Sequence, residues 1–86
     1  MYKIILLPSA ERVYKKLFET NRSAFRRIDK ALEDLKENPL QGKPLVAKLK
    51  GSYSLRVGVY RVIYQAEKKK SIVYILDIGH RKDIYR

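Results

Sequence analysis

The sequence predicts an α+β domain in which an N-terminal strand and a helical hairpin pack on a mainly antiparallel sheet of three or four strands. Two observations predict this class. A short apolar run at the N-terminus precedes two segments with helical periodicity, and the apolar period then changes to two for the rest of the chain. With 86 residues, the chain has the length of one small domain, so we expect a single domain over residues 1–86.

The first two elements follow from the N-terminal residues. The apolar, β-branched run from Tyr2 to Leu7 indicates a short strand. Pro8 favours the start of a helix, with Ser9 expected as its N-cap, and Thr20 and Asn21 end the pattern. The apolar positions of this helix recur at helical spacing and are Ala10, Val13, Tyr14, Leu17 and Phe18.

A second helix is expected from Arg22 or Ser23 to Asn38, because the residue before Pro39 avoids the helical region. Its apolar stripe is formed by Phe25, Ile28, Leu32 and Leu35. The polar faces of the two helices are basic. Such a face is usually only solvated, but RNA is an alternative partner for Arg12, Lys15, Lys16, Arg26, Arg27 and Lys30.

The C-terminal half contains a hairpin that brings two arginines together. Gly58-Val59 fits a two-residue turn of type II′. This turn places Arg56 opposite Arg61, on the sheet face away from the helices. Opposed like charges destabilise a sheet, unless both side chains extend into water or an anion lies between them. The predicted core face of the same hairpin consists of Tyr53, Leu55, Val57, Tyr60, Val62 and Tyr64.

The last strand is expected from Ile72 to Ile78 and leads into the tail "GHRKDIYR". If the preceding turn has three residues, Arg81 falls on the face of Arg56 and Arg61, and a two-residue turn reverses this. Tyr85 lies outside every apolar stripe, so it is available for chemistry or base stacking. With the three-residue turn, the core positions of this strand are Ile72, Tyr74, Leu76 and Ile78.

Composition restricts the possible partners. Twenty lysines and arginines face nine acids, and the formal net charge is +11. Residues 44–86 contain ten of these bases and only three acids, which argues against a heat-adapted surface of matched ion pairs and favours nucleic acid. The chain has no cysteine, one histidine and no membrane-spanning run, so we expect a cytoplasmic protein without a metal site.

Two motifs resemble the RelE branch of the RelE/ParE toxin superfamily: "RVGVYRVIY" at 56–64 and "HRKDIY" at 80–85. The resemblance covers nearly the whole chain and implies a RelE-like fold. It also implies a toxin that enters the ribosomal A site and cleaves mRNA. A cognate, locally acidic antitoxin similar to RelB would hold it inactive. No metal or cofactor is implied, because the 2′-hydroxyl of the mRNA attacks the adjacent phosphate.

The resemblance also implies residue roles. Arg61 and Arg81 match catalytic arginines that clamp the phosphate, and Tyr85 matches the C-terminal tyrosine, a candidate general base or stacking platform. Arg56 matches a basic position that binds the backbone or the transition state. Ser54 replaces a lysine of some relatives, which leaves one cation missing, and Ser54 itself is expected to contact RNA. The candidates to contact RNA or to supply that cation are Lys48, Lys50, His80 and Lys82.

Three alternatives remain at the level of sequence. The ParE branch shares the fold but inhibits DNA gyrase, and it commonly lacks the arginine and tyrosine set of the tail. A non-catalytic nucleic-acid-binding domain explains the charge but not the clustering of Arg56, Arg61, Arg81 and Tyr85. A decayed toxin that still binds its antitoxin is the third.

Overall fold

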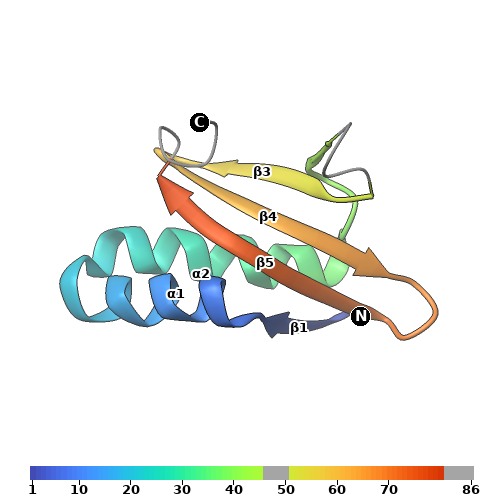
Figure 1. Ribbon diagram of the computed structural model, residues 1–86, viewed down its shortest axis with the longest axis horizontal. Helices are drawn as coiled ribbons and strands as arrows, with labels where there is room; N and C mark the ends of the chain where they lie inside the picture. Colours follow the sequence, from blue (N-terminus) through green and yellow to red (C-terminus); the bar gives the residue numbers. More distant parts are fainter. Residues whose placement is uncertain (46–50, 81–86) are drawn as a thin grey trace.

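Two helices cover one face of a five-stranded sheet in the computed structural model, which describes residues 1–45 and 51–80 (Figure 1). The sheet order is β1-β5-β4-β3-β2. β1 pairs with β5 in parallel and the other neighbours are antiparallel, so the expected α+β class is confirmed. The elements are β1 (Lys3–Leu6), α1 (Pro8–Thr20), α2 (Arg22–Glu37), β2 (Lys43–Pro44), β3 (Tyr53–Val57), β4 (Tyr60–Glu67) and β5 (Ile72–His80).

The start of α1 corrects one prediction. Leu7, with an extended backbone, is the N-cap residue, and Pro8 occupies the first turn. Proline is favoured there because its fixed φ suits the helix and its missing N–H is not needed. Ser9 therefore lies inside the helix and is not the N-cap. Its hydroxyl donates instead to Asp77 Oδ1 on β5 at 2.8 Å.

The second helix follows the sequence prediction. Asn21 caps it, because its side-chain oxygen accepts a hydrogen bond from the Ala24 N–H at 3.1 Å. The helix ends at Glu37, just before the Asn38-Pro39 pair. Its predicted stripe is buried at Ile28, Leu32 and Leu35. Within residues 1–45 and 51–80, neither helix is long and apolar enough to cross a bilayer.

The β3–β4 hairpin has the predicted register. Val57 pairs with Tyr60, and Arg56 pairs with Arg61. Gly58 has a φ of 62°, the left-handed value that the first central position of a type II′ turn requires. The hairpin's predicted apolar face packs into or against the core, with Val62 and Tyr64 fully buried.

Tyr64 also fixes the segment that enters β2. Its hydroxyl accepts a hydrogen bond from the Gly42 N–H at 2.9 Å, and its ring stacks on Tyr53 with centroids 5.5 Å apart. Burial raises the pKa of Tyr64, and the Gly42 hydrogen bond opposes this shift. A Cβ at Gly42 would lie 2.8 Å from the Tyr64 hydroxyl and 2.9 Å from the Ser54 carbonyl oxygen. Only glycine therefore fits there without a shift.

The core face of β5 differs from the prediction in its first half. Val73 and Ile75 are buried, so the assignment of Ile72, Tyr74 and Leu76 to the core was wrong. The connection from β4 occupies residues 68–71, an even number, which places Glu67 opposite Ile72 and reverses the parity that a three-residue turn would give.

A β-bulge then returns the last residues of β5 to the sheet faces that the sequence predicted. Tyr64 pairs with Ile75 and Ile63 pairs with Asp77, which leaves Leu76 as an extra residue. After the bulge, Ile78 is buried as predicted, at 1% exposure. Residue 79 consequently lies opposite Arg61.

Candidate functional site

Arg56 of β3 pairs with Arg61 of β4, and both lie on the sheet face opposite the core residues. The two helices cover the core face of the sheet (Figure 1). Arg56 is exposed and Arg61 is half-buried. The two residues are a directly opposed pair of β3 and β4, so their side chains leave the same face of the sheet. The structure therefore brings together two of the four residues predicted to be catalytic, and the position suits an anion.

The guanidinium of Arg56 is held toward the end of its own hairpin. Its Nε donates to the Gly58 carbonyl oxygen at 3.3 Å. Arg27 of α2 approaches the same turn, because a Cβ at Gly58 would lie 3.6 Å from Arg27 Nη1. Arg56 thus connects the open sheet face with the β3–β4 turn.

Arg61 has a different environment. On β5, Gly79 lies opposite it and contributes no side chain to this face. Ser54, two residues before Arg56, belongs to the same face but is buried at 6% exposure, opposite Ile63. Nearby, Gln65 Nε2 donates to Ser52 Oγ at 3.0 Å. Burial leaves Ser54 little surface for direct contact with RNA.

His80 lies on the other side of the sheet from the arginine pair. It pairs with Tyr60, a core-side residue, and the two rings are 6.0 Å apart with an interplanar angle of 68°. The structure therefore does not bring His80 together with Arg61. Instead, His80 lines a groove of about 780 Å³ between α1 and the end of β5, whose rim carries Arg12 and Lys16.

Five predicted site residues lie outside the described part of the chain. Arg81, Lys82 and Tyr85 follow β5, and Lys48 and Lys50 precede β3. Their roles remain predictions from the sequence.

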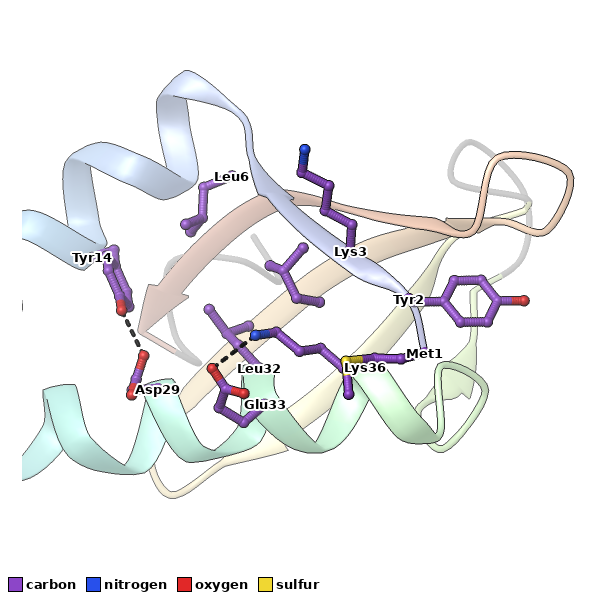
Figure 2. Close-up of a pocket in the computed structure, with 10 residues that line it drawn as sticks. Met1, Tyr2, Lys3, Leu6, Tyr14, Asp29, Leu32, Glu33 and Lys36 are labelled. Atoms are coloured by element: carbon purple, nitrogen blue, oxygen red, sulfur yellow. Dashed lines mark hydrogen bonds and ion pairs between the residues drawn. The ribbon is translucent and has the colours of Figure 1, made fainter.

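A second pocket, of about 460 Å³, lies between β1 and the helices and is shown in Figure 2. Tyr14 donates a hydrogen bond to Asp29 Oδ1 at 2.6 Å, and Lys36 lies 3.0 Å from Glu33 Oε1. Burial raises the pKa of Tyr14 to about 12, and the hydrogen bond and charge of Asp29 act in the same direction. The Tyr14–Asp29 hydrogen bond joins α1 to α2, whereas the Lys36–Glu33 pair lies within α2. Both contacts lie on the side of the sheet away from the arginine pair.

Two residues near the site were not anticipated. Asp77 is the polar residue of an apolar strand, and its carboxylate accepts hydrogen bonds from Ser9 Oγ at 2.8 Å and from the Ile78 N–H at 3.0 Å. An acid in a buried strand is a sequence signal for such a role. Arg27 was assigned to the basic helix face, and nothing in its spacing indicates contact with the β3–β4 turn.

Comparisons with known proteins agree with this fold. A family model described as the ParE toxin of the type II toxin-antitoxin system matches residues 4–85. Toxin RelG of Mycobacterium tuberculosis is 43% identical over 60 residues, covering 69% of each chain. The putative toxin RelE4 of Methanocaldococcus jannaschii is 23% identical, covering 100% of this chain and 93% of that protein.

Solved structures show the same architecture. The toxin-antitoxin complex RelBE2 of M. tuberculosis contains a chain with a TM-score of 0.81 and 32% identity, covering 93% of this chain and 98% of that one. The isolated RelE toxin of E. coli matches with a TM-score of 0.77 and 20% identity, covering 93% and 84% of the two chains, and this likeness concerns the fold alone.

The chain therefore belongs to the RelE/ParE superfamily, the toxins of type II toxin–antitoxin systems. Within this superfamily, it is similar to RelE-type toxins in sequence and in structure. The resemblance drawn from the two sequence motifs is confirmed.

Proposed function

We propose that this toxin is a ribosome-dependent mRNA endoribonuclease that cleaves in the A site and stops translation in the cytoplasm. The observation that carries the proposal is the direct pairing of Arg56 with Arg61 on the helix-free face. A strand pair with opposed guanidinium groups is unfavourable by itself and becomes favourable around a phosphate. The RelE-like motif at residues 80–85 follows directly at the end of β5.

The proposed chemistry needs a base, cations around the phosphorus and a proton donor for the leaving oxygen. A base removes the proton of the 2′-hydroxyl, the oxygen attacks the adjacent phosphorus, and the bond to the 5′-oxygen breaks. The products are a 2′,3′-cyclic phosphate and a 5′-hydroxyl, after the leaving oxygen receives a proton. Arg61 and Arg81 stabilise the charge on the phosphorane, and Tyr85 is the candidate base. A tyrosine has an ordinary pKa near 10, so this role requires neighbouring cations.

The proposed partners are the ribosome with its mRNA and a cognate, locally acidic antitoxin similar to RelB. The formal charge of +11 favours association with both kinds of polyanion. The similar chain from M. tuberculosis was solved in a toxin-antitoxin complex, RelBE2, which supports an antitoxin as a partner.

The decisive experiment adds the purified toxin to ribosomes programmed with a defined mRNA. We expect cleavage within the A-site codon and little cleavage of free RNA. Arg61→Gln should reduce the single-turnover rate by about 100-fold or more, because one fixed cation at the transition state is lost. Lys68→Gln removes the same charge from the exposed β4–β5 connection, at the opposite end of β4 from Arg61, and serves as the matched control.

Growth measurements extend the test to the tail. Expression of the toxin should arrest growth, and Arg81→Ala or Tyr85→Phe should relieve the arrest. Full toxicity in both variants would contradict the assignment of these residues, and intact mRNA on stalled ribosomes would contradict the nuclease activity.

A second candidate function is inhibition of DNA gyrase, favoured by the match to the ParE family model over residues 4–85. A supercoiling assay with purified gyrase separates the two functions. Inhibition of supercoiling without cleavage of ribosome-bound mRNA would establish the ParE-like activity.

A further inference from the structure

A second cationic surface lies where β3 turns into β4. We define the turn strip as Arg27, Lys30 and Arg56, all of which are exposed. Arg56 Nε donates to the Gly58 carbonyl oxygen at 3.3 Å, and a Cβ at Gly58 would lie 3.6 Å from Arg27 Nη1. Two arginines from different elements therefore lie beside a single turn.

The charges of the turn strip are poorly compensated. Within residues 1–45 and 51–80, no carboxylate forms an ion pair with Arg27 or Arg56. Lys30 lies 3.9 Å from Asp34 Oδ2, but this pair is exposed on one helix and therefore weak. Like charges held close together repel, so a bound anion would be stabilised at this turn.

Two small depressions lie beside the turn strip, and polar and apolar side chains both line them. A depression of about 300 Å³ runs between α2 and β3. The three cations of the turn strip line it together with Asp34, Gln41 and the apolar residues Ala31, Leu55 and Val57. A second depression, of about 220 Å³, continues past Arg27 along the β3–β4 turn. Protein partners usually bind through large apolar or aromatic anchors in deep pockets. Both depressions are much smaller than the groove of about 780 Å³ beside α1, and three cations surround the first of them, which favours a polyanion over an apolar anchor.

We propose that the turn strip binds backbone phosphates of RNA outside the cleavage site. This inference rests on the proposed function, because Arg56 belongs both to the open sheet face and to the turn strip. An RNA strand that leaves the sheet face at Arg56 reaches Arg27 and Lys30 next. The planar fork of arginine suits phosphate oxygens, and a series of such contacts orients RNA without reading its sequence.

The test measures binding of an uncleavable RNA without the ribosome. The probe is a 2′-O-methyl oligouridylate of about 12 nucleotides, a length within the range that small domains bind. The variant is Arg27→Gln with Lys30→Gln. The matched control is Lys68→Gln with Lys69→Gln, which removes the same charge from the exposed β4–β5 connection at the opposite end of β4. Circular dichroism verifies that both variants fold.

The salt dependence of the dissociation constant gives the answer. Each phosphate contact with a single strand contributes about 0.7 to the slope of log K against log salt concentration. Loss of two contacts should lower the slope by about 1.4 and weaken binding by about 25-fold at ~0.1 M salt. The control should keep the slope of the unsubstituted toxin.

Two outcomes would overturn the inference. Equal losses of RNA affinity in the variant and in the control would mean that net charge alone attracts RNA. Polyglutamate that binds the unsubstituted toxin as tightly as the RNA, with the same loss in the variant, would assign the turn strip to an acidic polypeptide. Neither result depends on cleavage, so failure of the ribosome assay remains a separate result that concerns only the proposed function.

Discussion

Tyr14 shows how one partly buried hydroxyl couples the two helices. It donates to Asp29 at 2.6 Å, and its ring lies 4.8 Å from that of Phe25. Because α1 and α2 are joined only by Asn21, such contacts determine how closely they pack. The ring and the hydrogen bond act together, so removing the hydroxyl alone separates the two contributions.

We predict that Tyr14→Phe lowers the free energy of unfolding by about 1 kcal/mol at neutral pH, because Asp29 loses its donor. The pKa of Tyr14 is raised to about 12 in the folded protein, from 10.0. Its stabilising contribution is therefore complete below pH 10.0 and is lost as the pH approaches 12.

Urea denaturation of both proteins between neutral pH and pH 11 measures this difference. The gap in unfolding free energy should stay constant to about pH 10 and then narrow. A gap that stays constant throughout would show that the hydroxyl of Tyr14 titrates alike in the folded and unfolded chain.

At the scale of elements, the bulge in β5 links the end of the sheet to α1. Asp77 accepts hydrogen bonds from Ser9 Oγ and from the Ile78 N–H at this point. Among the described residues, the strand beside β5 on this side is β1, which ends at Leu6 because the chain turns into α1 at Pro8. Asp77 therefore satisfies a backbone donor where the neighbouring strand has ended.

We predict that Asp77→Ala destabilises the protein by about 2 kcal/mol, because two donors lose their acceptor. Ser9→Ala removes only one hydrogen bond and should have about half of that effect. Thermal unfolding of the two variants and of the double variant gives the comparison. Equal effects of the single variants would mean that the bond to the Ile78 N–H contributes nothing.

Local sequence patterns predicted the helices and the β3–β4 hairpin. The apolar stripe around Ile28 and the strand register around the turn at Gly58 depend on residues that are close in sequence. The pairing of Arg56 with Arg61 followed from this register. The bulge at Leu76 was not predictable, because the apolar residues of β5 fit either face. Likewise, Arg27 approaches Gly58 only through the packing of α2 against the sheet.

At the scale of the whole molecule, charge is the dominant property. The chain carries a formal +11. Within residues 1–45 and 51–80, the ion pairs are three contacts inside helices, two of them exposed and the third, Lys36 with Glu33, partly exposed. Exposed ion pairs contribute little to the stability of the fold, so salt that screens them removes little stability. Repulsion among the excess cations acts over the whole surface and weakens the compact state. These two effects of salt oppose each other, and repulsion is the larger.

We therefore predict that the melting temperature rises with salt, by several degrees between about 10 mM and 200 mM sodium chloride. The Debye length falls from about 30 Å to less than 10 Å over this range, which is shorter than most distances across the molecule. Its principal extents are 35, 30 and 21 Å. Differential scanning calorimetry at constant pH measures the shift, and Lys68→Gln with Lys69→Gln should reduce it because the excess charge falls by two. A melting temperature that decreases with salt would show that attractive pairs outweigh the repulsion.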